Sequence, residues 1–590
     1  MVPLNLSISL PIRPVTSKVS RPQVGRTSAN GMSYVSGVSS QPLLGMTISQ
    51  AFDNAVSHWG EKTALFVRHQ NIRWTYRQLA AQVNAFAAGL LSYGLQSGDR
   101  IGIWSPNCAE WVIAQFATAK AGLILVNINP AYKPAELAYV LRKVKCRALI
   151  TATSFKSSDY LSMLTSVAPD LLEGTPGELR LESLPDLRVV FQIGGPLRQG
   201  AVAFEAVQAR ADLNQRRLLS EIAASLQFDD AINIQFTSGT TGLPKGATLT
   251  HHNLLNNGFF TGQLMRFTPD DRLCIPVPFY HCFGMVLANL VCVTHGATMV
   301  VPSEAFDAKA VLEAIEAERC TALHGVPTMF IALLQHPEFS RFDLTSLRTG
   351  IMAGSPCPIE VMRRVIEEMR MCEITIGYGM TETSPLSFQS KPEDTIERRV
   401  STVGRIHPHV EVKIVNETGH IVPRDVAGEL CTRGYSVMRG YWDDPEKTAE
   451  AIDKDGWMHT GDLATIDEQG YCNIVGRITD MVIRGGENIY PREIEEFLYS
   501  HPSVQEVQIF GVPDPKYGEE LCAWIQLREG AVADEEAIRS YCSGRIAHYK
   551  VPRYVRFVSE FPMTVTGKIQ KFVMRQQMSA ALALEEQRTA

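Results

Sequence analysis

Short apolar runs alternate with helical segments from about residue 75 to about residue 380, and this alternation limits the folds open to the chain. After Thr75, apolar side chains recur at steps of three and four, the spacing of one buried helix face. Thr75 and Gln78 have capping-box spacing, and Gly94 suits the helix end. Two strand-like runs with an apolar helix between them follow in 100–127. The pattern predicts parallel α/β architecture.

The pattern of the sequence changes at two further points along the chain. After about residue 400, short strands, glycines and acidic turns indicate a smaller β-rich subdomain, and from Arg477 strand and helix patterns continue to Phe557. We therefore predict an α/β fold: a large N-terminal domain of two parallel-type α/β subdomains plus a β-rich subdomain, and a small mobile α+β C-terminal domain. The predicted parts are a flexible N-terminal tail at 1–44, the large domain at 45–477 and the C-terminal domain at 478–590.

Composition and charge exclude several classes of protein. The 590 residues include 56 basic and 62 acidic side chains, a net charge of 56 − 62 = −6, and no basic stripe interleaved with aromatic residues is present. Nucleic-acid binding is therefore disfavoured. The 12 cysteines form no CxxC pair and none has zinc-ligand spacing with histidine. We interpret them as reduced core residues of an intracellular protein.

Residues 273–303 form a stretch of 31 residues without Asp, Glu, Lys or Arg, long enough to suggest a membrane span. A spanning helix needs about 20 predominantly apolar residues. Pro276, Pro278, His281 and Asn289 interrupt this stretch. A buried helix followed by a buried strand is the better interpretation.

The amino-terminal residues 1–31 are basic and rich in Ser and Thr, and the first acidic residue is Asp53. This composition is typical of a transit peptide, but a continuous apolar core is absent. We favour a disordered tail, or an upstream extension before Met32. The expected location is the cytoplasm, with the mitochondrial matrix as the alternative if residues 1–31 direct import.

A Gly- and Thr-rich string, TSGTTGLPKG, occupies residues 237–246 directly after the strand-like run 231–236. Glycines let the backbone approach a ligand closely, while hydroxyls, backbone N–H groups and Lys245 can bind phosphate oxygens. The string is not a Walker A loop, because Pro244 precedes the lysine and Gly246 follows it. It predicts a phosphate-binding loop.

This string resembles the phosphate-binding signature of the adenylate-forming superfamily, which includes acyl-CoA synthetases, luciferases and adenylation domains of peptide synthetases. Further strings occur in the family's order over residues from about 50 to 575: YGMTE at 378–382, TGD at 460–462, GR at 476–477, GG at 485–486 and PMTVTGK at 562–568. From Ser33 onward and in RGGENIY at 484–490, the chain resembles the medium-chain acyl-CoA synthetase family member 2 type.

The resemblance implies a complete set of nucleotide-binding residues. The expected contacts to ATP phosphates are Thr237, Ser238, Gly239, Thr240, Thr241, Gly242, Leu243, Pro244 and Lys245. Thr381 resembles the hydroxyl at the α-phosphate, and Glu382 the carboxylate that holds Mg²⁺. Asp462 and Arg477 resemble the ribose contacts, and Gly354 and Tyr378 are expected near the base and nucleotide.

Lys568 resembles the lysine that bridges the substrate carboxylate and the α-phosphate, and it should stabilise charge in the transition state. A lysine so near the end of the chain can act there only if its domain closes on the large one. The family turns on a residue two after the arginine, here Thr479, where it usually has Asp or Lys. Gly485 and Gly486 would line a narrow tunnel for coenzyme A.

The acyl pocket is assigned to Phe279, His281 and Phe283, in a segment without acidic residues. An apolar wall favours a hydrocarbon or aryl acid over an amino acid. The expected enzyme is an ATP-dependent fatty acyl-CoA synthetase using ATP, Mg²⁺ and coenzyme A, with a medium-chain acid as expected substrate. Alternatives are an aryl acid–CoA ligase and a non-catalytic nucleotide sensor. Chain length, oligomeric state and loose membrane association stay open; no transmembrane segment or nucleic-acid partner is expected.

Overall fold

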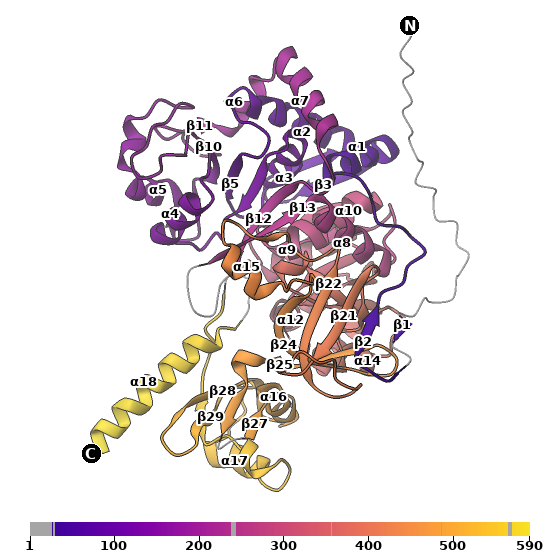
Figure 1. The fold of residues 1–590 in the computed structure, drawn as a ribbon, viewed down its shortest axis with the longest axis vertical. Coiled ribbons are helices and arrows are strands. Elements are labelled where there is room, and N and C mark those ends of the chain that lie inside the picture. The colour runs from indigo at the N-terminus through magenta and orange to yellow at the C-terminus, as the bar shows by residue number, and fades with distance from the viewer. Residues whose placement is uncertain are drawn as a thin grey trace.

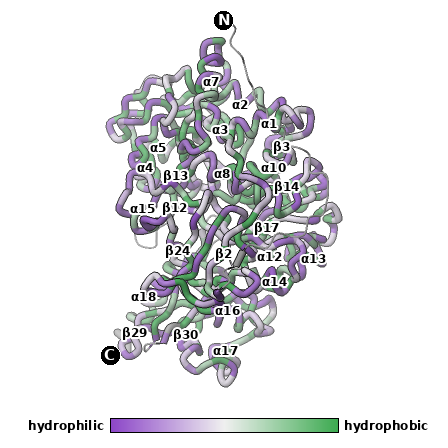
Figure 2. Tube along the Cα trace, turned by 45° about the vertical axis from the view of Figure 1, so that its right-hand side comes forward, coloured by the Kyte–Doolittle hydropathy of each residue, from purple (hydrophilic) through white to green (hydrophobic). Residues whose placement is uncertain are grey.

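The computed structural model contains two large sheets, a six-stranded sheet and a C-terminal sheet (Figure 1). The structure describes residues 26–27, 30–237, 244–355, 357–484, 487–564 and 569–589. In both views, α7 lies at one end of the molecule and α17 of the C-terminal unit at the other (Figures 1 and 2).

The first large sheet has eight strands, and its strands from β11 to β12 are parallel. The strand β13 returns antiparallel to β12 and pairs with β23. In spatial order the strands are β11 (Val202–Ala203), β10 (Val189–Ile193), β7 (Ala148–Ala152), β5 (Arg100–Trp104), β6 (Ile124–Asn127), β12 (Ala231–Thr237), β13 (Lys245–Thr250) and β23 (Gly440–Tyr441).

The second large sheet has nine strands, with a parallel centre and antiparallel strands at both edges. In spatial order they are β20 (Arg405–Ile406), β19 (Leu386–Gln389), β18 (Glu373–Gly379), β17 (Thr349–Ala353), β16 (Ala322–Gly325), β14 (Arg272–Cys274), β15 (Thr298–Val301), β3 (Thr63–Val67) and β4 (Ile72–Thr75). A separate small hairpin joins β8 (Ser154–Phe155) and β9 (Ser158–Asp159).

Helices cover both faces of each large sheet, as parallel sheets require. One continuous apolar core lies between the two sheets, and separate cores lie on their outer faces. The α-helices of this region are α1 (Ile48–Trp59), α2 (Tyr76–Leu91), α3 (Ala109–Ala121), α4 (Pro134–Lys143), α5 (Tyr160–Val167), α6 (Phe204–Ala209), α7 (Leu213–Ser225), α8 (His251–Leu264), α9 (Cys282–Gly284), α10 (Val291–His295), α11 (Ala308–Glu318), α12 (Pro327–Leu334), α13 (Ile359–Glu368) and α14 (Ile396–Ser401). Short 3₁₀ turns are η1 (Pro169–Glu173), η3 (Phe339–Arg341) and η4 (Thr381–Thr383), and η2 (Met285–Leu290) is a π-helix.

The predicted helix after Thr75 is α2, and its capping box is present: Thr75 accepts from the Gln78 backbone and Gln78 accepts from the Thr75 backbone. The uncharged stretch 273–303 folds as predicted, with η2 and α10 followed by the buried strand β15. Within the described residues, no helix combines the length and the apolar character needed to cross a bilayer.

The six-stranded sheet is the predicted β-rich part, and it corrects one expectation. Its strands are β1 (Arg26–Thr27), β2 (Tyr34–Ser36), β21 (Val410–Val415), β22 (Gly428–Gly434), β24 (Met458–Ile466) and β25 (Cys472–Arg477), and α15 (Pro445–Ala451) precedes β24. Strand β2 pairs with β21, and Val35 is buried. The predicted flexible tail at 1–44 is therefore wrong for residues 34–36, because a strand of only three residues leaves almost no periodic signal in the sequence.

The C-terminal unit begins directly after β25, through the 3₁₀ turn η5 (Ile478–Asp480), and has a core of its own. Its strands are β26 (Val482–Arg484), β27 (Glu487–Ile489), β28 (Val504–Asp514), β29 (Gly518–Leu527) and β30 (Tyr554–Phe557); its helices are α16 (Pro491–Tyr499), α17 (Glu535–Cys542), η6 (His548–Lys550) and α18 (Lys571–Thr589). The predicted α/β architecture is confirmed. The exact domain bounds and the mobility of this unit stay predictions.

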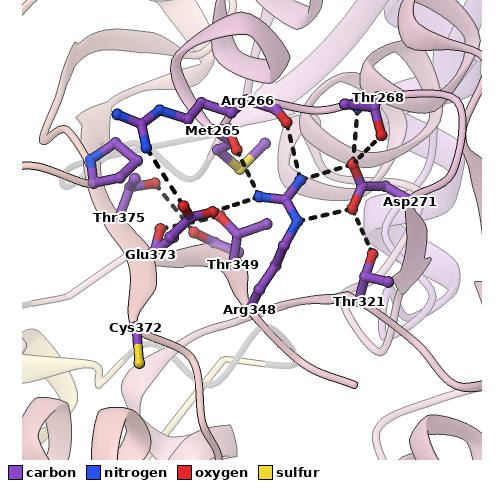
Figure 3. A network of polar contacts seen from close by, with 12 residues as sticks. Met265, Arg266, Thr268, Asp271, Thr321, Arg348, Thr349, Cys372, Glu373 and Thr375 are labelled. Carbon is purple, nitrogen blue, oxygen red and sulfur yellow. Dashed lines mark hydrogen bonds and ion pairs between the residues drawn. The ribbon is translucent and has the colours of Figure 1, made fainter. Parts of the chain in front are cut away.

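A partly buried ionic network ties the amino ends of the central strands of the nine-stranded sheet together (Figure 3). The Arg348 guanidinium donates to both Asp271 oxygens, at 2.7 and 3.1 Å, and to Glu373 Oε2 at 2.5 Å. Thr268 and Thr321 also donate to Asp271. These residues lie at the ends of the strands opposite to Gly354 and Tyr378, so we assign the network to stability.

Candidate active site

The two ends of the predicted phosphate loop are held by a pair of antiparallel strands. Thr237 ends β12, Lys245 begins β13, and the two residues are register partners. Residues Ser238, Gly239, Thr240, Thr241, Gly242 and Leu243 lie outside the described residues, and Pro244 precedes β13. The chain continues from Lys245 as a strand, whereas a Walker A loop leads into a helix. The predicted difference from a Walker A loop is confirmed.

Glu382 lies beside the start of this loop. It is in η4, directly after β18, and its Oε1 accepts from Thr237 Oγ1 at 3.3 Å and from Tyr441 O–H at 2.9 Å. Lys245 Nζ lies 4.5 Å from the Tyr441 ring centroid. Burial, together with the charge of Glu382, raises the pKa of Tyr441, which therefore stays a hydrogen-bond donor. The two large sheets thus bring a hydroxyl, a lysine and a carboxylate together.

The Glu382 carboxylate has the properties of a metal ligand. The residue is 7% exposed, and no Lys, Arg or His among the described residues lies within ion-pair distance of it. A buried carboxylate without a cation is costly, since burial removes the water that stabilises its charge. Oxygen ligands with one carboxylate suit Mg²⁺. Glu382, with Thr237 beside it, therefore fits the predicted ion.

Asp462 is the second buried carboxylate of the region, and two donors orient it. Tyr378 O–H donates to Oδ2 at 2.5 Å, and Arg477 Nε donates to Oδ1 at 3.0 Å. Asp462 on β24 and Arg477 on β25 are register partners. Burial and the Asp462 charge raise the pKa of Tyr378. Burial lowers the pKa of Arg477, but Asp462 and Asp480 outweigh it, so the pKa is raised and the guanidinium stays charged.

Gly354 lies at the carboxyl end of β17, beside the carboxyl end of β18 that carries Tyr378. Its φ of +97° disfavours any residue with a side chain, and an added Cβ would lie 3.1 Å from Val326 Cγ1. Ligands of open α/β sheets bind at the carboxyl ends of the strands. Gly354, Tyr378, Thr381 and Glu382 all lie at this edge.

The predicted acyl-pocket residues surround the beginning of α9. Phe279 is fully buried with its ring 5.4 Å from that of Trp111, and Phe283 is buried with its ring 5.7 Å from that of His324. His281 caps α9, its Nδ1 accepting from the Phe283 backbone at 3.2 Å. Buried polar side chains also contact this segment: Asn107 accepts from the Phe279 backbone, and Asn127 donates to the Tyr280 carbonyl. An apolar wall and its contact with an acyl chain stay predictions.

Several predicted residues cannot be placed by this geometry. Lys568, Gly485 and Gly486 lie outside the described residues. Thr479, the predicted hinge, is in η5 between β25 and β26. Tyr441 was missed by the sequence reasoning, because its contact with Glu382 joins residues 59 positions apart and no motif surrounds it.

Comparison with known proteins agrees with this arrangement. The AMP-binding enzyme family matches residues 52–442, and the AMP-binding enzyme C-terminal domain family matches residues 493–568. The chain is 47% identical over 94% of its length to the mitochondrial medium-chain acyl-CoA ligase ACSF2 of Rattus norvegicus, covering 91% of that protein. It is 49% identical over 90% of its length to the putative acyl-CoA synthetase YngI of Bacillus subtilis, covering 97% of it.

Solved structures show the same architecture. The anthranilate CoA ligase AuaEII in complex with anthranoyl-AMP superposes with a TM-score of 0.80 at 28% identity, over 92% of this chain and 99% of that one. ATP-bound MatB from Rhodopseudomonas palustris gives a TM-score of 0.75 at 30% identity, over 90% of this chain and 99% of that one. The chain belongs to the AMP-binding enzyme family, within the adenylate-forming superfamily that its motifs resemble.

Proposed function

We propose that the chain is an ATP-dependent acyl-CoA synthetase that activates a medium-chain fatty acid. The observation that carries this proposal is the 47% identity to a medium-chain acyl-CoA ligase over 94% of the chain. The site supports it, because buried carboxylates, a lysine and hydroxyl donors are the groups that binding of Mg²⁺ and nucleotide requires. A non-catalytic sensor would not require Glu382 and Lys568, and both are present.

In the first step, an oxygen of the fatty acid attacks the α-phosphorus of ATP, giving acyl-AMP, and the bond to pyrophosphate breaks. Two anions must approach each other, so positioned cations and donors lower the barrier. Lys245 is suited to the outgoing phosphates: it lies at the loop, and among the described residues no carboxylate pairs with it. Thr381 would donate to the α-phosphate, and Lys568 would bridge both anions.

Glu382 would hold Mg²⁺ together with oxygens of the ATP phosphates, and Thr237 lies beside that carboxylate. When bound, the ion would supply positive charge that stabilises the charge developing on the phosphates. Asp462 would accept hydrogen bonds from the ribose hydroxyls, with Arg477 and Tyr378 fixing its orientation. Gly354 would leave room for the adenine ring against the backbone.

In the second step, the thiol sulfur of coenzyme A attacks the acyl carbon, and AMP leaves. One site can serve both steps if the C-terminal unit rotates after adenylation, exchanging Lys568 for the segment of Gly485 and Gly486. The chain passes from β25 of the six-stranded sheet to β26 of the C-terminal unit through η5, which contains Thr479. We therefore propose this turn as the hinge. In the conformation described, α16 contacts β25 through a hydrogen bond from Arg492 to the Ile474 carbonyl.

An aryl acid–CoA ligase is the second candidate. The structural similarity to an anthranilate CoA ligase favours it, because a buried apolar wall around Phe279 and Phe283 could also receive a ring. The higher sequence identity to medium-chain ligases, 47% against 28%, favours the fatty acid.

Localisation in mitochondria is proposed in place of the cytoplasm. The support comes from the mitochondrial relatives, which are similar over 94–95% of this chain. The basic composition of residues 1–31 agrees with import.

The proposal is tested by measuring pyrophosphate release and thioester formation with a panel of acids from acetate to palmitate, together with benzoate and cinnamate. We expect the highest kcat/KM with octanoate or a neighbouring chain length. A maximum with benzoate or cinnamate would favour the aryl ligase, and absence of turnover with every acid would contradict both candidates.

A further inference from the structure

Three side chains with metal-binding atoms gather on the six-stranded sheet, outside the proposed active site. They are Glu429, Cys431 and His459, and their ligand atoms all lie within 4.8 Å of one another. Glu429 and Cys431 are two residues apart on β22, so their side chains share one face of the sheet. His459 on β24 is the register partner of Cys431. The sheet itself therefore fixes the three side chains together.

An irregularity in the strand pairing brings the third ligand close. The register between β22 and β24 shifts between Glu429 and Cys431, so more residues of β24 than of β22 lie in this interval. Such a bulge turns side chains toward one another. As a result, His459 Nδ1 lies 3.6 Å from Cys431 Sγ and also 2.8 Å from Glu429 Oε2.

The distance between Cys431 Sγ and His459 Nδ1 agrees with a tetrahedral centre. Zinc bonds of about 2.3 Å to sulfur and about 2.0 Å to nitrogen or oxygen place S and N about 3.5 Å apart, and N and O about 3.3 Å apart. The observed S···N distance is 3.6 Å. The N···O distance of 2.8 Å is that of a hydrogen bond, and it would have to open by about 0.5 Å to admit an ion.

The surroundings supply what a bound ion needs. The Cys431 thiol is fully buried, while the Glu429 and His459 side chains are 23% and 33% exposed, which leaves a route from solvent. Asp453 Oδ2 lies 3.8 Å from His459 Nε2, the nitrogen that would not bind the ion. A metal-bound histidine usually donates its far ring N–H to a carboxylate or carbonyl oxygen. Asp453 would have to move about 0.8 Å closer to accept that hydrogen bond.

We propose that Glu429, Cys431 and His459 form a binding site for one divalent transition-metal ion of the zinc class. Sulfur and imidazole select such ions over Mg²⁺ and Ca²⁺, which prefer oxygen ligands. On binding, the Cys431 thiol loses its proton to solvent, and the His459 proton moves by exchange with solvent from Nδ1 to Nε2, so that Nδ1 is free to bind. The hydrogen bond between His459 and Glu429 is then replaced by two bonds to the ion. Three protein ligands leave the fourth position for water.

The site lies next to the segment that carries Asp462. The Gly461 backbone N–H donates to Glu429 Oε1 at 3.3 Å, the oxygen that does not contact His459. A bound ion would hold β22 and β24 together at this point, so we assign it a stabilising role. This inference does not depend on the proposed substrate.

The test uses the full chain after treatment with a chelator. Titration with Zn²⁺ should give one equivalent bound per chain and raise the midpoint of thermal unfolding by a few degrees. Titration with Co²⁺ should give the near-ultraviolet charge-transfer absorption of a cobalt–thiolate bond. Cys431→Ser should abolish that absorption, and His459→Gln should weaken Zn²⁺ binding at least about tenfold.

Cys372→Ser is the matched control, because it removes an exposed thiol and should change neither result. Circular dichroism checks that each variant is folded, and Glu429→Gln provides a second variant whose side chain keeps its size. The inference is overturned if Zn²⁺ does not bind in a 1:1 ratio, if Cys431→Ser binds as tightly as the unsubstituted chain, or if Cys372→Ser abolishes the cobalt absorption.

Discussion

Arg477 Nε lies 3.0 Å from Asp462 Oδ1, across the pairing of β25 with β24, and Arg477 is the last residue of the sheet before the chain enters the C-terminal unit. The proposed ribose ligand is thus held by the residue that precedes the proposed hinge. Because the Asp462 side chain is only 7% exposed, its orientation depends on Arg477 and on Tyr378. If Asp462 binds the ribose as proposed, we expect nucleotide binding and domain position to be coupled at this pair.

Asp462→Asn is expected to raise the KM for ATP by roughly 10- to 100-fold, because hydrogen bonds to a charged group contribute about 1.5–3 kcal/mol. The amide also loses the ion pair with Arg477. Steady-state kinetics with varied ATP measure the effect. Glu411→Gln is the control, since it weakens an ion pair with Arg433 of similar length on the same sheet. An equal rise in both variants would contradict the role of Asp462.

Glu382→Gln is expected to raise the Mg²⁺ concentration for half-maximal activity by at least about tenfold, since a neutral amide binds a hard dication weakly. The amide still accepts from Tyr441 and Thr237, so the fold should be retained. Activity measured against Mg²⁺ concentration at fixed ATP tests this. An unchanged Mg²⁺ dependence would exclude Glu382 as the metal ligand.

Lys568→Ala is expected to reduce adenylation by roughly 10²–10³-fold, because it removes a charge that acts in the transition state. Thioester formation from supplied acyl-AMP should remain close to normal. The two half-reactions are measured separately, as pyrophosphate exchange and as acyl-CoA formation from acyl-AMP. Lys516→Ala, which removes a lysine of the same C-terminal unit, serves as control. Equal loss of both half-reactions would refute the assignment.

Arg348→Met is expected to destabilise the protein by about 2 kcal/mol, because Asp271, 3% exposed, would lose its cation. This loss of stability is smaller than that expected for a fully buried ion pair, since the Arg348 side chain is 31% exposed. The kcat should stay unchanged. Arg341→Met breaks an exposed pair with Glu338 and should leave the urea midpoint nearly unchanged. Urea unfolding measures both; a similar midpoint for the two variants would contradict the assigned role of the network.

Stability is expected to fall as the pH drops below about 6.5, the ordinary pKa of histidine. Burial lowers the pKa of His324 to about 4, and its Nδ1 accepts from the Ile351 N–H while Nε2 donates to the Leu287 carbonyl. The unfolded chain therefore binds more protons between about pH 4 and 6.5, so stability rises with pH in that window. Burial also lowers the pKa of His251 and His407 to about 3 and of His295 to about 4.

For His324 alone, the expected loss at pH 5 relative to pH 8 is about 2 kcal/mol. Urea midpoints at several pH values measure it. His324→Gln should reduce this dependence by the share of His324, because an amide does not titrate, whereas His58→Gln at an exposed position should leave it unchanged. The same pH dependence in both variants would show that His324 is not one of the groups responsible.

Local signals made much of the fold predictable. The cap of α2 depends on Thr75 and Gln78, which are three residues apart, and the uncharged stretch 273–303 could be assigned from its prolines and polar residues. Such features are set by neighbours in sequence. The loop at 237–246 was found in the same way, because its residue types are constrained along one short string.

Contacts set by strand register could not be predicted. Cys431 and His459 are 28 positions apart, so they have no zinc-ligand spacing along the chain. The pairing of β22 with β24, including its bulge, brings them together. The contact of Tyr441 with Glu382 likewise requires β23 to pair with β13. Strand β2 was missed since three residues give no clear alternation.

The central claim, adenylation of a fatty acid, is tested most directly by exchange of labelled pyrophosphate into ATP with octanoate present and coenzyme A absent. The account predicts exchange that requires the acid and Mg²⁺ but not coenzyme A, because acyl-AMP forms before the thiol reacts. Exchange that does not require an acid, or release of ADP and phosphate in place of AMP and pyrophosphate, would contradict it.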